Sequence, residues 1–313
     1  MAIANSSQHT LFFDAEAAYG DQDASTAYVE VEHATCNFNV TKSAIESERI
    51  RGDRNIDDSR HGVHTVGGEI TAELSYAPSN LTLLEAALGG TYTTGSSSAA
   101  DDDIVKVGSS RRSFTFERNF KDITAGDFHY YQGMEVSSVS ISVAPDAMVG
   151  VTYGFVGKSL TVSDAIDSHG SDTAVAAAIK PFDSFSAVIK EAGSTVANVT
   201  GLEITIENGL APAFIIGSKF TSRPALGKCR VTGNLTAFFE DKTLLNKFLD
   251  EDESSLEITF TDGTNSLKIA IPRIKFNSGQ TDVSGEEQIS LGMDFQALYD
   301  STSATTISID KTP

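Results

Sequence analysis

The chain has no tryptophan, two cysteines and few basic residues. Among its 313 residues, 23 are Lys or Arg and 43 are Asp or Glu, which gives a formal net charge of -20 at pH 7. A protein that grips nucleic-acid phosphates needs a basic surface, so this balance argues against one. Cys36 and Cys229 lie far apart in the sequence, and we interpret them as small buried hydrophobic residues of a reducing compartment rather than as a disulfide.

Long apolar runs and enzyme signatures are also missing. No stretch of 18 apolar residues occurs, and the first ten residues lack both a basic and an apolar segment, so we expect no membrane span and no signal peptide. The patterns GxSxG and HExxH and a phosphate-binding loop are absent from the sequence. The sequence therefore predicts a protein that is not an enzyme, with no catalytic residue, no cofactor and no bound metal.

Short segments of alternating polarity make up most of the chain. They are rich in Val, Ile, Thr and Phe, which predicts a mainly antiparallel β protein. They span residues 28–31, 36–40, 69–76, 113–116, 136–143, 150–156, 185–189, 202–206, 234–239, 256–260, 267–271 and 289–295. Residues 81–88 and 242–249 instead space their leucines as helices do. We expect these two short helices to dock on sheets, with Asn80 and Asp241 as N-terminal caps.

The sequences around the two expected helices resemble each other. Residues 66–74 (VGGEITAEL) and 231–239 (VTGNLTAFF) match at constant spacing, and 82–84 match 243–245 (TLL). We interpret this match as an internal duplication, with chance similarity between two strand–helix segments as the alternative. The expected organisation is a first unit over residues 1–162, an exposed Ala-rich connector over 163–180 and a second unit over 181–313. Each unit is expected to be an antiparallel β-sandwich or barrel with one short flanking α-helix.

Several strings of the sequence carry a family resemblance. They are 50–54 (IRGDR), 58–62 (DSRHG), 66–70 (VGGEI), 83–88 (LLEAAL), 114–118 (FTFER), 133–143 (GMEVSSVSISV), 272–275 (PRIK) and 295–300 (FQALYD). In this order they resemble the tail tube proteins of long-tailed, non-contractile bacteriophages (siphoviruses). The likeness covers nearly the whole chain except the first 25 or so residues and the segment 95–103.

The resemblance implies a duplicated tail-tube fold and a structural virion protein, synthesised in the bacterial host cytoplasm. Its stacked rings would form the tail tube, through which double-stranded DNA passes without specific binding. The resemblance also implies a tape measure protein, a tail terminator and distal tail proteins as partners, and no membrane. With two units per chain, a homotrimeric ring would have pseudo-sixfold symmetry. The alternative function is a β-sandwich adhesin or virion decoration protein that binds a host surface.

Channel-lining residues can be proposed from the alternation in residues 66–76. Even-numbered positions from 70 to 74 are apolar, and odd-numbered positions are polar. If this strand belongs to the inner sheet, the channel is lined by Glu69, Thr71 and Glu73, with Asn234 and Thr236 as counterparts in the second unit. A conduit must not bind its cargo, so we expect an acidic lining.

Two long polar segments, 41–65 and 207–230, precede the matching strands. Loops of this length are uncommon in compact domains unless they have a function, so we expect them to bridge neighbouring subunits or rings, with a solvated excursion as the alternative. The first mixes charges of both signs that suit pairing across an interface, namely Glu46, Glu48, Arg49, Arg51, Asp53, Arg54, Asp57, Asp58 and Arg60.

Three other motifs have simpler interpretations. The tripeptide Arg-Gly-Asp at 51–53 is interpreted as a chance occurrence. His61 and His64 lie near two aspartates but lack the closed ligand set of a structural metal site. The run DDD at 101–103 lacks the alternating oxygen donors of a calcium loop, so we expect a solvated turn there.

Overall fold

The structure is a computed structural model, in which the described residues are 3–21, 27–50, 52–94, 103–123, 125–164, 173–175, 179–283, 286 and 288–312. The fold is mainly antiparallel β with two α-helices in this part of the chain, as the sequence predicts. All twelve segments predicted to be strands overlap observed strands. Of the solvated turn expected at 101–103, residues 101 and 102 lie outside the described residues, and Asp103 is not in a turn but begins strand β7 (Asp103–Lys106). Most of the connector, 165–172 and 176–178, also lies outside the described residues.

The N-terminal half contributes a short 3-10 helix, eleven strands and one α-helix. They are η1 (Ser6–Gln8), β1 (His9–Ala15), β2 (Val29–Glu30), β3 (Thr35–Cys36), β4 (Asn39–Glu46), β5 (Ser59–Glu73), α1 (Pro78–Leu88), β6 (Thr93–Thr94), β7 (Asp103–Lys106), β8 (Phe114–Phe120), β9 (Phe128–Val143), β10 (Gly150–Gly157) and β11 (Ser159–Ser163).

The C-terminal half contributes the remaining strands and the second helix. They are β12 (Val188–Glu191), β13 (Ser194–Thr195), β14 (Val199–Glu207), β15 (Ala211–Ala213), β16 (Ser222–Ala225), β17 (Arg230–Phe238), α2 (Thr243–Leu249), β18 (Glu253–Thr261), β19 (Ser266–Phe276), β20 (Gln280–Asp282), β21 (Ser290–Ala297) and β22 (Ser308–Thr312).

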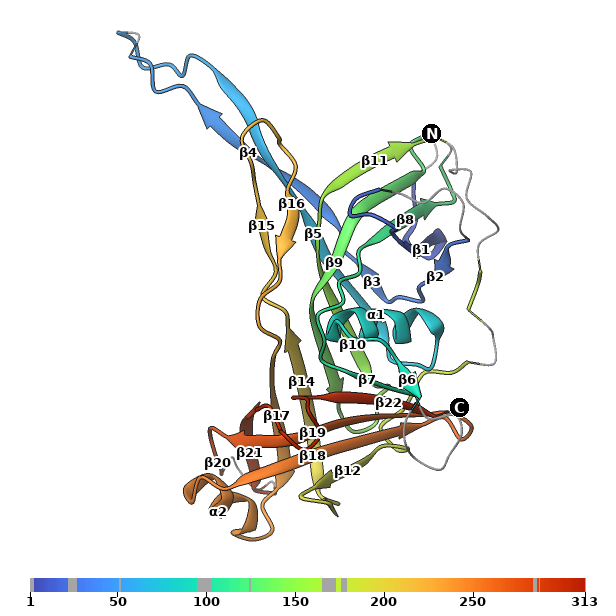
Figure 1. Ribbon diagram of the computed structural model, residues 1–313, viewed down its shortest axis with the longest axis vertical. Helices are drawn as coiled ribbons and strands as arrows, with labels where there is room; N and C mark the ends of the chain where they lie inside the picture. The colour runs from blue at the N-terminus through green and yellow to red at the C-terminus, as the bar shows by residue number, and fades with distance from the viewer. Residues whose placement is uncertain are drawn as a thin grey trace.

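Six strands that are neighbours in space form a continuous antiparallel sheet through both halves of the chain, in the order β5–β10–β9–β14–β17–β21. The two halves meet where β9 pairs with β14 along residues 138–143 and 202–207. We call this run of strands the central sheet. In Figure 1 its strands β5, β9, β10 and β14 run along the long axis of the molecule.

The pairing order of the first half occurs again in the second. In the first half the order is β4–β5–β10–β9–β8–β1. In the second half it is β14–β17–β21–β19–β18–β12. An α-helix follows the second strand of each series in the sequence, α1 after β5 and α2 after β17.

The two helices differ in how deeply they are buried. Helix α1 begins at Pro78, which suits the first turn of a helix, and ends at Gly89 in the left-handed conformation (φ 60°). It buries several side chains, including Leu83 and Leu84, against the core. Helix α2 has no buried residue, and Leu249 is 63% exposed. Both helices thus occur where the leucine spacing predicts them. Helix α2 packs on the core through the partly buried Leu244, Leu245 and Phe248, whereas α1 is buried more deeply.

Neither expected residue is the N-cap of its helix. Asn80 lies inside the first turn of α1, where its side-chain amide donates to Ser75 Oγ (2.9 Å) and its Oδ1 accepts from Tyr153 (3.0 Å). The cap position is Ala77, because Pro78 begins the helix two residues before Asn80. The cap position of α2 is Lys242. Asp241, one residue earlier, accepts a 2.7 Å hydrogen bond from the Thr243 N–H.

The halves share one hydrophobic core rather than folding as separated bodies. Phe182, just after the connector, is fully buried and stacks on Phe260 of the second half. Its backbone N–H donates to Leu74 O (2.8 Å), and its carbonyl accepts from Val149 N–H (2.9 Å), so it continues the first half's hydrogen bonding. The chain segment after the expected boundary at residue 181 therefore packs against both halves.

Truncation of this junction residue should strongly destabilise the protein. Phe182→Ala removes a buried ring and leaves a cavity between the halves, so we expect a loss of about 3–5 kcal/mol in the free energy of unfolding. Phe185→Ala is the matched control, because Phe185 is 79% exposed and its loss should change stability by less than about 0.5 kcal/mol. Urea unfolding of both variants measures the difference, and equal effects would contradict the shared-core description.

The two cysteines are free, as the sequence predicts. Both are half-buried rather than fully buried. Burial raises the pKa of the Cys229 thiol to about 11 and that of the Cys36 thiol above its ordinary value, which keeps both protonated at neutral pH.

Candidate functional site

One side of the central sheet is polar from edge to edge, and we call it the polar face. Its residues share this side because paired residues of antiparallel strands point the same way. They are Glu69, Thr71 and Glu73 of β5, Gly150, Thr152 and Gly154 of β10, Ser138, Ser140 and Ser142 of β9, Glu203, Thr205 and Glu207 of β14, Arg230, Thr232, Asn234 and Thr236 of β17, and Gly292, Asp294 and Gln296 of β21.

The register makes this face continuous across the two halves. One row of directly paired residues crosses the sheet from Glu73 to Asp294, through Gly150, Ser142, Glu203 and Asn234. Small or polar side chains occupy every step of the row. The face is therefore a single surface built by both halves of the chain.

The opposite side of the same sheet is buried. Another row of directly paired residues is at most 1% exposed; it consists of Ile70, Tyr153, Val139, Ile206 and Val231. Because side chains alternate between the two sides of a strand, burying this row forces the polar row outward. The alternation in the sequence thus fixes which side of the sheet faces solvent.

Negative charge dominates the polar face. The carboxylates are Glu69, Glu73, Glu203, Glu207 and Asp294, and Arg230 is the basic residue among those that define the face. Hydrogen bonds from Asn234 (2.8 Å) and Ser278 (2.9 Å) hold the pKa of Asp294 below its ordinary value, so this carboxylate stays charged at neutral pH. Ser140 donates to Glu203 at 3.0 Å.

The structure brings all five predicted channel-lining residues onto this one face. Glu69 and Glu73 are exposed, and Thr71, Asn234 and Thr236 are half-buried. Sequence reasoning missed Glu203, Glu207 and Asp294. The alternation LEITIE at 202–207 could have indicated the first two, but not that β14 joins the same sheet as β5.

The two long polar segments form hairpins rather than loops. Strands β4 and β5 extend far beyond the body as one arm, and β15 and β16 form a shorter arm beside it (Figure 1). The arms touch where His64 N–H donates to Lys219 O (2.8 Å) and the His64 ring packs edge-on against Phe220. Backbone pairing within each hairpin supplies partners for N–H and C=O groups, which explains why these exposed segments form strands.

The predicted bridging charges lie at the end of the long arm. Glu46 and Arg60 are in its strands, Glu48, Asp53 and Arg54 are exposed in the tip, and Arg51 lies outside the described residues. Ion pairs form locally between Arg49 and Asp57 (3.0 Å) and between Arg60 and Asp58 (3.1 Å).

The ends of both arms also carry exposed isoleucines, which the sequence analysis did not predict because it considered only the charged residues. In the long arm Ile50 is 95% exposed and Ile56 is 66% exposed. In the short arm Ile215 and Ile216 are exposed as well. Apolar side chains held out in solvent are typical of a contact surface.

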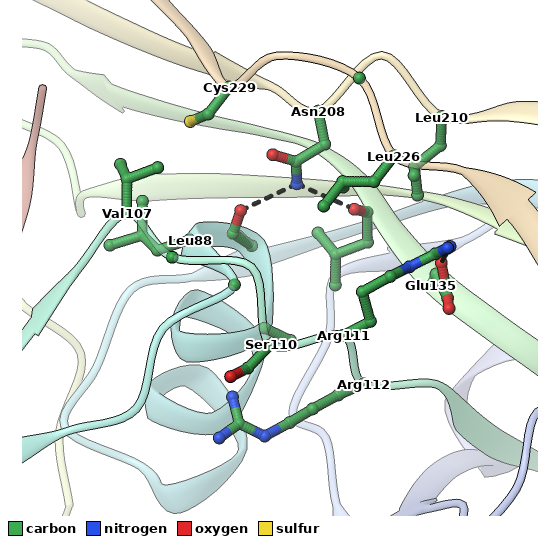
Figure 2. A pocket seen from close by; sticks show the side chains of 16 residues that line it. Leu88, Val107, Ser110, Arg111, Arg112, Glu135, Asn208, Leu210, Leu226 and Cys229 are labelled. Carbon is green, nitrogen blue, oxygen red and sulfur yellow. Dashed lines mark hydrogen bonds and ion pairs between the residues drawn. The ribbon is translucent and has the colours of Figure 1, made fainter. Parts of the chain in front are cut away.

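The short arm is anchored to the first half at its base. Figure 2 shows a cleft there, between the end of α1, residues 107–112, β9 and the segments flanking the short arm. Asn208 is buried in it and donates to Ala87 O (2.8 Å) and Val136 O (3.1 Å). The buried carboxylate of Glu135 accepts hydrogen bonds from Arg111 and, at 2.6 Å, from Arg223 of β16.

Neutralising this buried carboxylate should loosen the junction. Glu135→Gln leaves Arg111 without its counter-charge, and we expect a loss of about 3 kcal/mol in the free energy of unfolding. Glu253→Gln is the matched control, because the Glu253–Arg273 pair is bidentate but about 40% exposed, and solvent screening should make its loss much less costly. Thermal or urea unfolding decides, and a smaller effect for the Glu135 variant than for the control would contradict the anchoring role.

In the part of the chain that the structure describes, no three His, Cys, Asp or Glu side chains gather as a metal site would require. His61 and His64 belong to the long arm, with His64 packed on Phe220. No α-helix among the described residues has the length and apolarity of a membrane span.

These features define a β-rich protein with a polar, acidic sheet face and two projecting arms. The chain belongs to the phage tail tube protein family, whose model matches residues 6–297. This match confirms the resemblance to tail tube proteins and gives the chain a structural role in the virion. A search of curated proteins finds no match to it.

Proposed function

We propose that three copies of this chain close into a ring, that the rings stack into the tail tube of a siphovirus, and that the polar face lines its channel. The observation that carries the proposal is the continuous central sheet, in which each half of the chain contributes three strands and the same polar side. One chain would then act as two quasi-equivalent wedges of the ring wall.

Internal duplication is part of this proposal. Its support is the repeated pairing order of the two halves and the matching sequences at residues 66–74 and 231–239. Gly68 and Gly233 occupy matching places. A Cβ at Gly68 would meet Asn37 O, and one at Gly233 would meet Glu203 O, so in both halves the neighbouring backbone comes too close for a larger residue.

The size of a closed wall agrees with three chains. Each chain offers eight strand positions, in the order β4, β5, β10, β9, β14, β17, β21 and β20. About 24 strands spaced ~4.8 Å apart enclose a barrel of roughly 37 Å before tilt and about 50 Å with strands tilted near 45°. A barrel of ~8 strands from one chain would be on the order of 12 Å wide. Only the larger barrel admits a DNA duplex once side chains are subtracted.

Acidic lining suits a conduit for DNA. A duplex carries about one negative charge per 1.7 Å of its axis, so cations along the wall would hold it through counterion release. Carboxylates such as Glu69 and Glu203 instead repel it and keep it centred and sliding. DNA would therefore pass without specific binding during ejection.

The arms are proposed to join stacked rings. They project away from the body in the same direction (Figure 1), and their ends carry exposed isoleucines as well as charges. Partners that would start, measure and end the tube, namely distal tail proteins, a tape measure protein and a tail terminator, follow from the tail tube role. Synthesis in the host cytoplasm is part of the same proposal.

Electron microscopy of the purified protein tests the proposal. Negative-stain images should contain tubes or annuli with a central channel. A field of discrete compact particles at high protein concentration would instead favour an adhesin or a virion decoration protein.

A further inference from the structure

Strands β9 and β14 form strand pairs on both edges. Among the described residues, the strands that correspond to them in the other half form strand pairs along one edge. Along residues 138–143, β9 lies between β10 and β14. In the described chain, β20 pairs with β21, and β3 and β4 pair with β5. An edge strand presents a row of backbone donors and acceptors that another strand can use. The series of strands that contains the central sheet therefore ends at β3–β4 in the first half and at β20 in the second.

The register shows which segments correspond. Cys36 and Val40 pair with Ile70 and Val66, as Leu202 and Ile206 pair with Leu235 and Val231. Both pairs are four residues apart, so β3–β4 together correspond to β14.

The second correspondence is equally regular. In the first half Val136 pairs with Phe155 and Ser140 with Thr152. In the second half Phe276 pairs with Phe295 and Gln280 with Gly292. In both halves the two residues of the first strand are four apart, and their partners on the second strand are three apart. The segment β19–β20 thus corresponds to β9, and the end of β9 that pairs with β14 corresponds to β20.

We infer that β20 of one subunit pairs antiparallel with β3–β4 of the next, in the register that joins β9 to β14 within each chain. This inference rests on the proposed ring and specifies its subunit interface. Within the chain Glu207 lies opposite Ser138 and Thr205 opposite Ser140. Between chains, Thr41 then lies opposite Ser278 and Asn39 opposite Gln280. The interface is head-to-tail, so it excludes a two-fold dimer and forms a closed ring when the rotation between neighbouring subunits closes.

A cleft beside α2 independently supports this assignment. It is lined by Phe248, Leu249, Glu251, Asp252, Lys275, Phe276 and Asn277, at the places that correspond to the Asn208 cleft of Figure 2. Asn208 follows Glu207 at the end of β14, and its counterpart Lys42 follows Thr41 in β4. Lys42 is exposed, and the cleft beside α2 carries two carboxylates, Glu251 and Asp252, against one ammonium group, Lys275. The neighbour's ammonium group would therefore balance the charge of the cleft.

The exposed surface of α2 has the same explanation. Leu249 corresponds to Leu88 of α1, which is 2% exposed because the second half covers that end of the first half. Leu249 is 63% exposed in one subunit. A neighbour seated on this end would bury it.

Disulfide cross-linking tests the register. In a background with Cys36→Ala and Cys229→Ala, Thr41→Cys with Ser278→Cys places one thiol on each side of the inferred interface. Paired Cα atoms of antiparallel strands are about 4.5–5.5 Å apart, which a disulfide can span. Oxidised rings should give covalent dimers and trimers on non-reducing gels, with no larger species.

Two matched variants control the experiment. Ser138→Cys with Glu207→Cys lies at the corresponding internal pair and should form a disulfide within one chain. Asn37→Cys with Ser278→Cys is four residues out of register, roughly 13 Å apart, and should not cross-link. Rings that form without cross-linking of the test pair, or with cross-linking of the shifted pair, would overturn the register while leaving the ring intact. A protein that forms no ring in any variant would overturn the proposed function itself.

Charge exchange examines the Lys42 contact. Lys42→Glu should reduce ring formation at low salt, and adding Asp252→Lys should restore it by exchanging the two charges. Asp252→Lys alone should be impaired like Lys42→Glu. Equal ring yields in all variants would remove Lys42 from the interface.

Discussion

Shortening the long arm should leave the subunits and rings intact but abolish stacked tubes. Glu46 and Ser59 are paired in the hairpin, so residues 47–58 can be replaced by Asn-Gly, a two-residue turn that suits such a pair. No core residue is removed, and we expect the melting temperature to stay within about 4 °C of the original. The exposed tip with Ile50 and Ile56 is lost, so rings should lose their contact with the next ring.

Size-exclusion chromatography and electron microscopy measure the outcome. A matched variant makes the same Asn-Gly replacement in the turn at 262–265 of the body, where Thr261 pairs with Ser266. That variant should form tubes of ordinary length. Tubes of ordinary length from the arm variant, or loss of tubes from both, would contradict the role of the arm.

Reversing charge on the polar face should slow the passage of DNA. Glu69→Lys with Glu73→Lys changes the charge by four per chain, and thus by about twelve in a three-chain ring. Both side chains are exposed, so the tube should still assemble. Cations repeated along the wall bind duplex phosphates by counterion release, and we expect DNA release from virions to slow at least about tenfold at low salt.

The salt dependence distinguishes this mechanism from a general defect. Counterion release weakens as salt is added, so ejection should recover at higher ionic strength. The matched control Glu32→Lys with Glu240→Lys has the same net charge, with both residues exposed and outside the central sheet. Ejection kinetics that are unchanged in the polar-face variant, or equally slowed in the control, would contradict a lining role.

The fold could be predicted from the sequence because alternation records burial directly. Ile70 is buried and Glu69 is exposed because consecutive side chains of a strand point to opposite sides of the sheet. The alternation of polarity in the sequence therefore shows which side of the central sheet is buried. The leucine spacing identified both helices. The cap at Asn80 was wrong because Pro78 could begin the helix earlier, and the buried amide serves Tyr153 and Ser75 instead.

Long-range pairing was harder to predict. Nothing local in residues 202–207 indicates that they pair with β9 of the other half, and this pairing makes the polar face continuous. The long polar segments were predicted as loops because their strands are exposed on all sides and lack the alternating pattern. Because the arm buries almost no side chains, its sequence has no alternation of polar and apolar residues from which its strands could be predicted.

A cross-section of the assembled tube by electron cryomicroscopy tests the central claim most directly. The map should show three chains per ring, six similar wedges around the channel, and the side chains of Glu69, Glu203 and Asp294 on the channel wall. A ring of six chains, or these carboxylates on the outer surface of the tube, would contradict it.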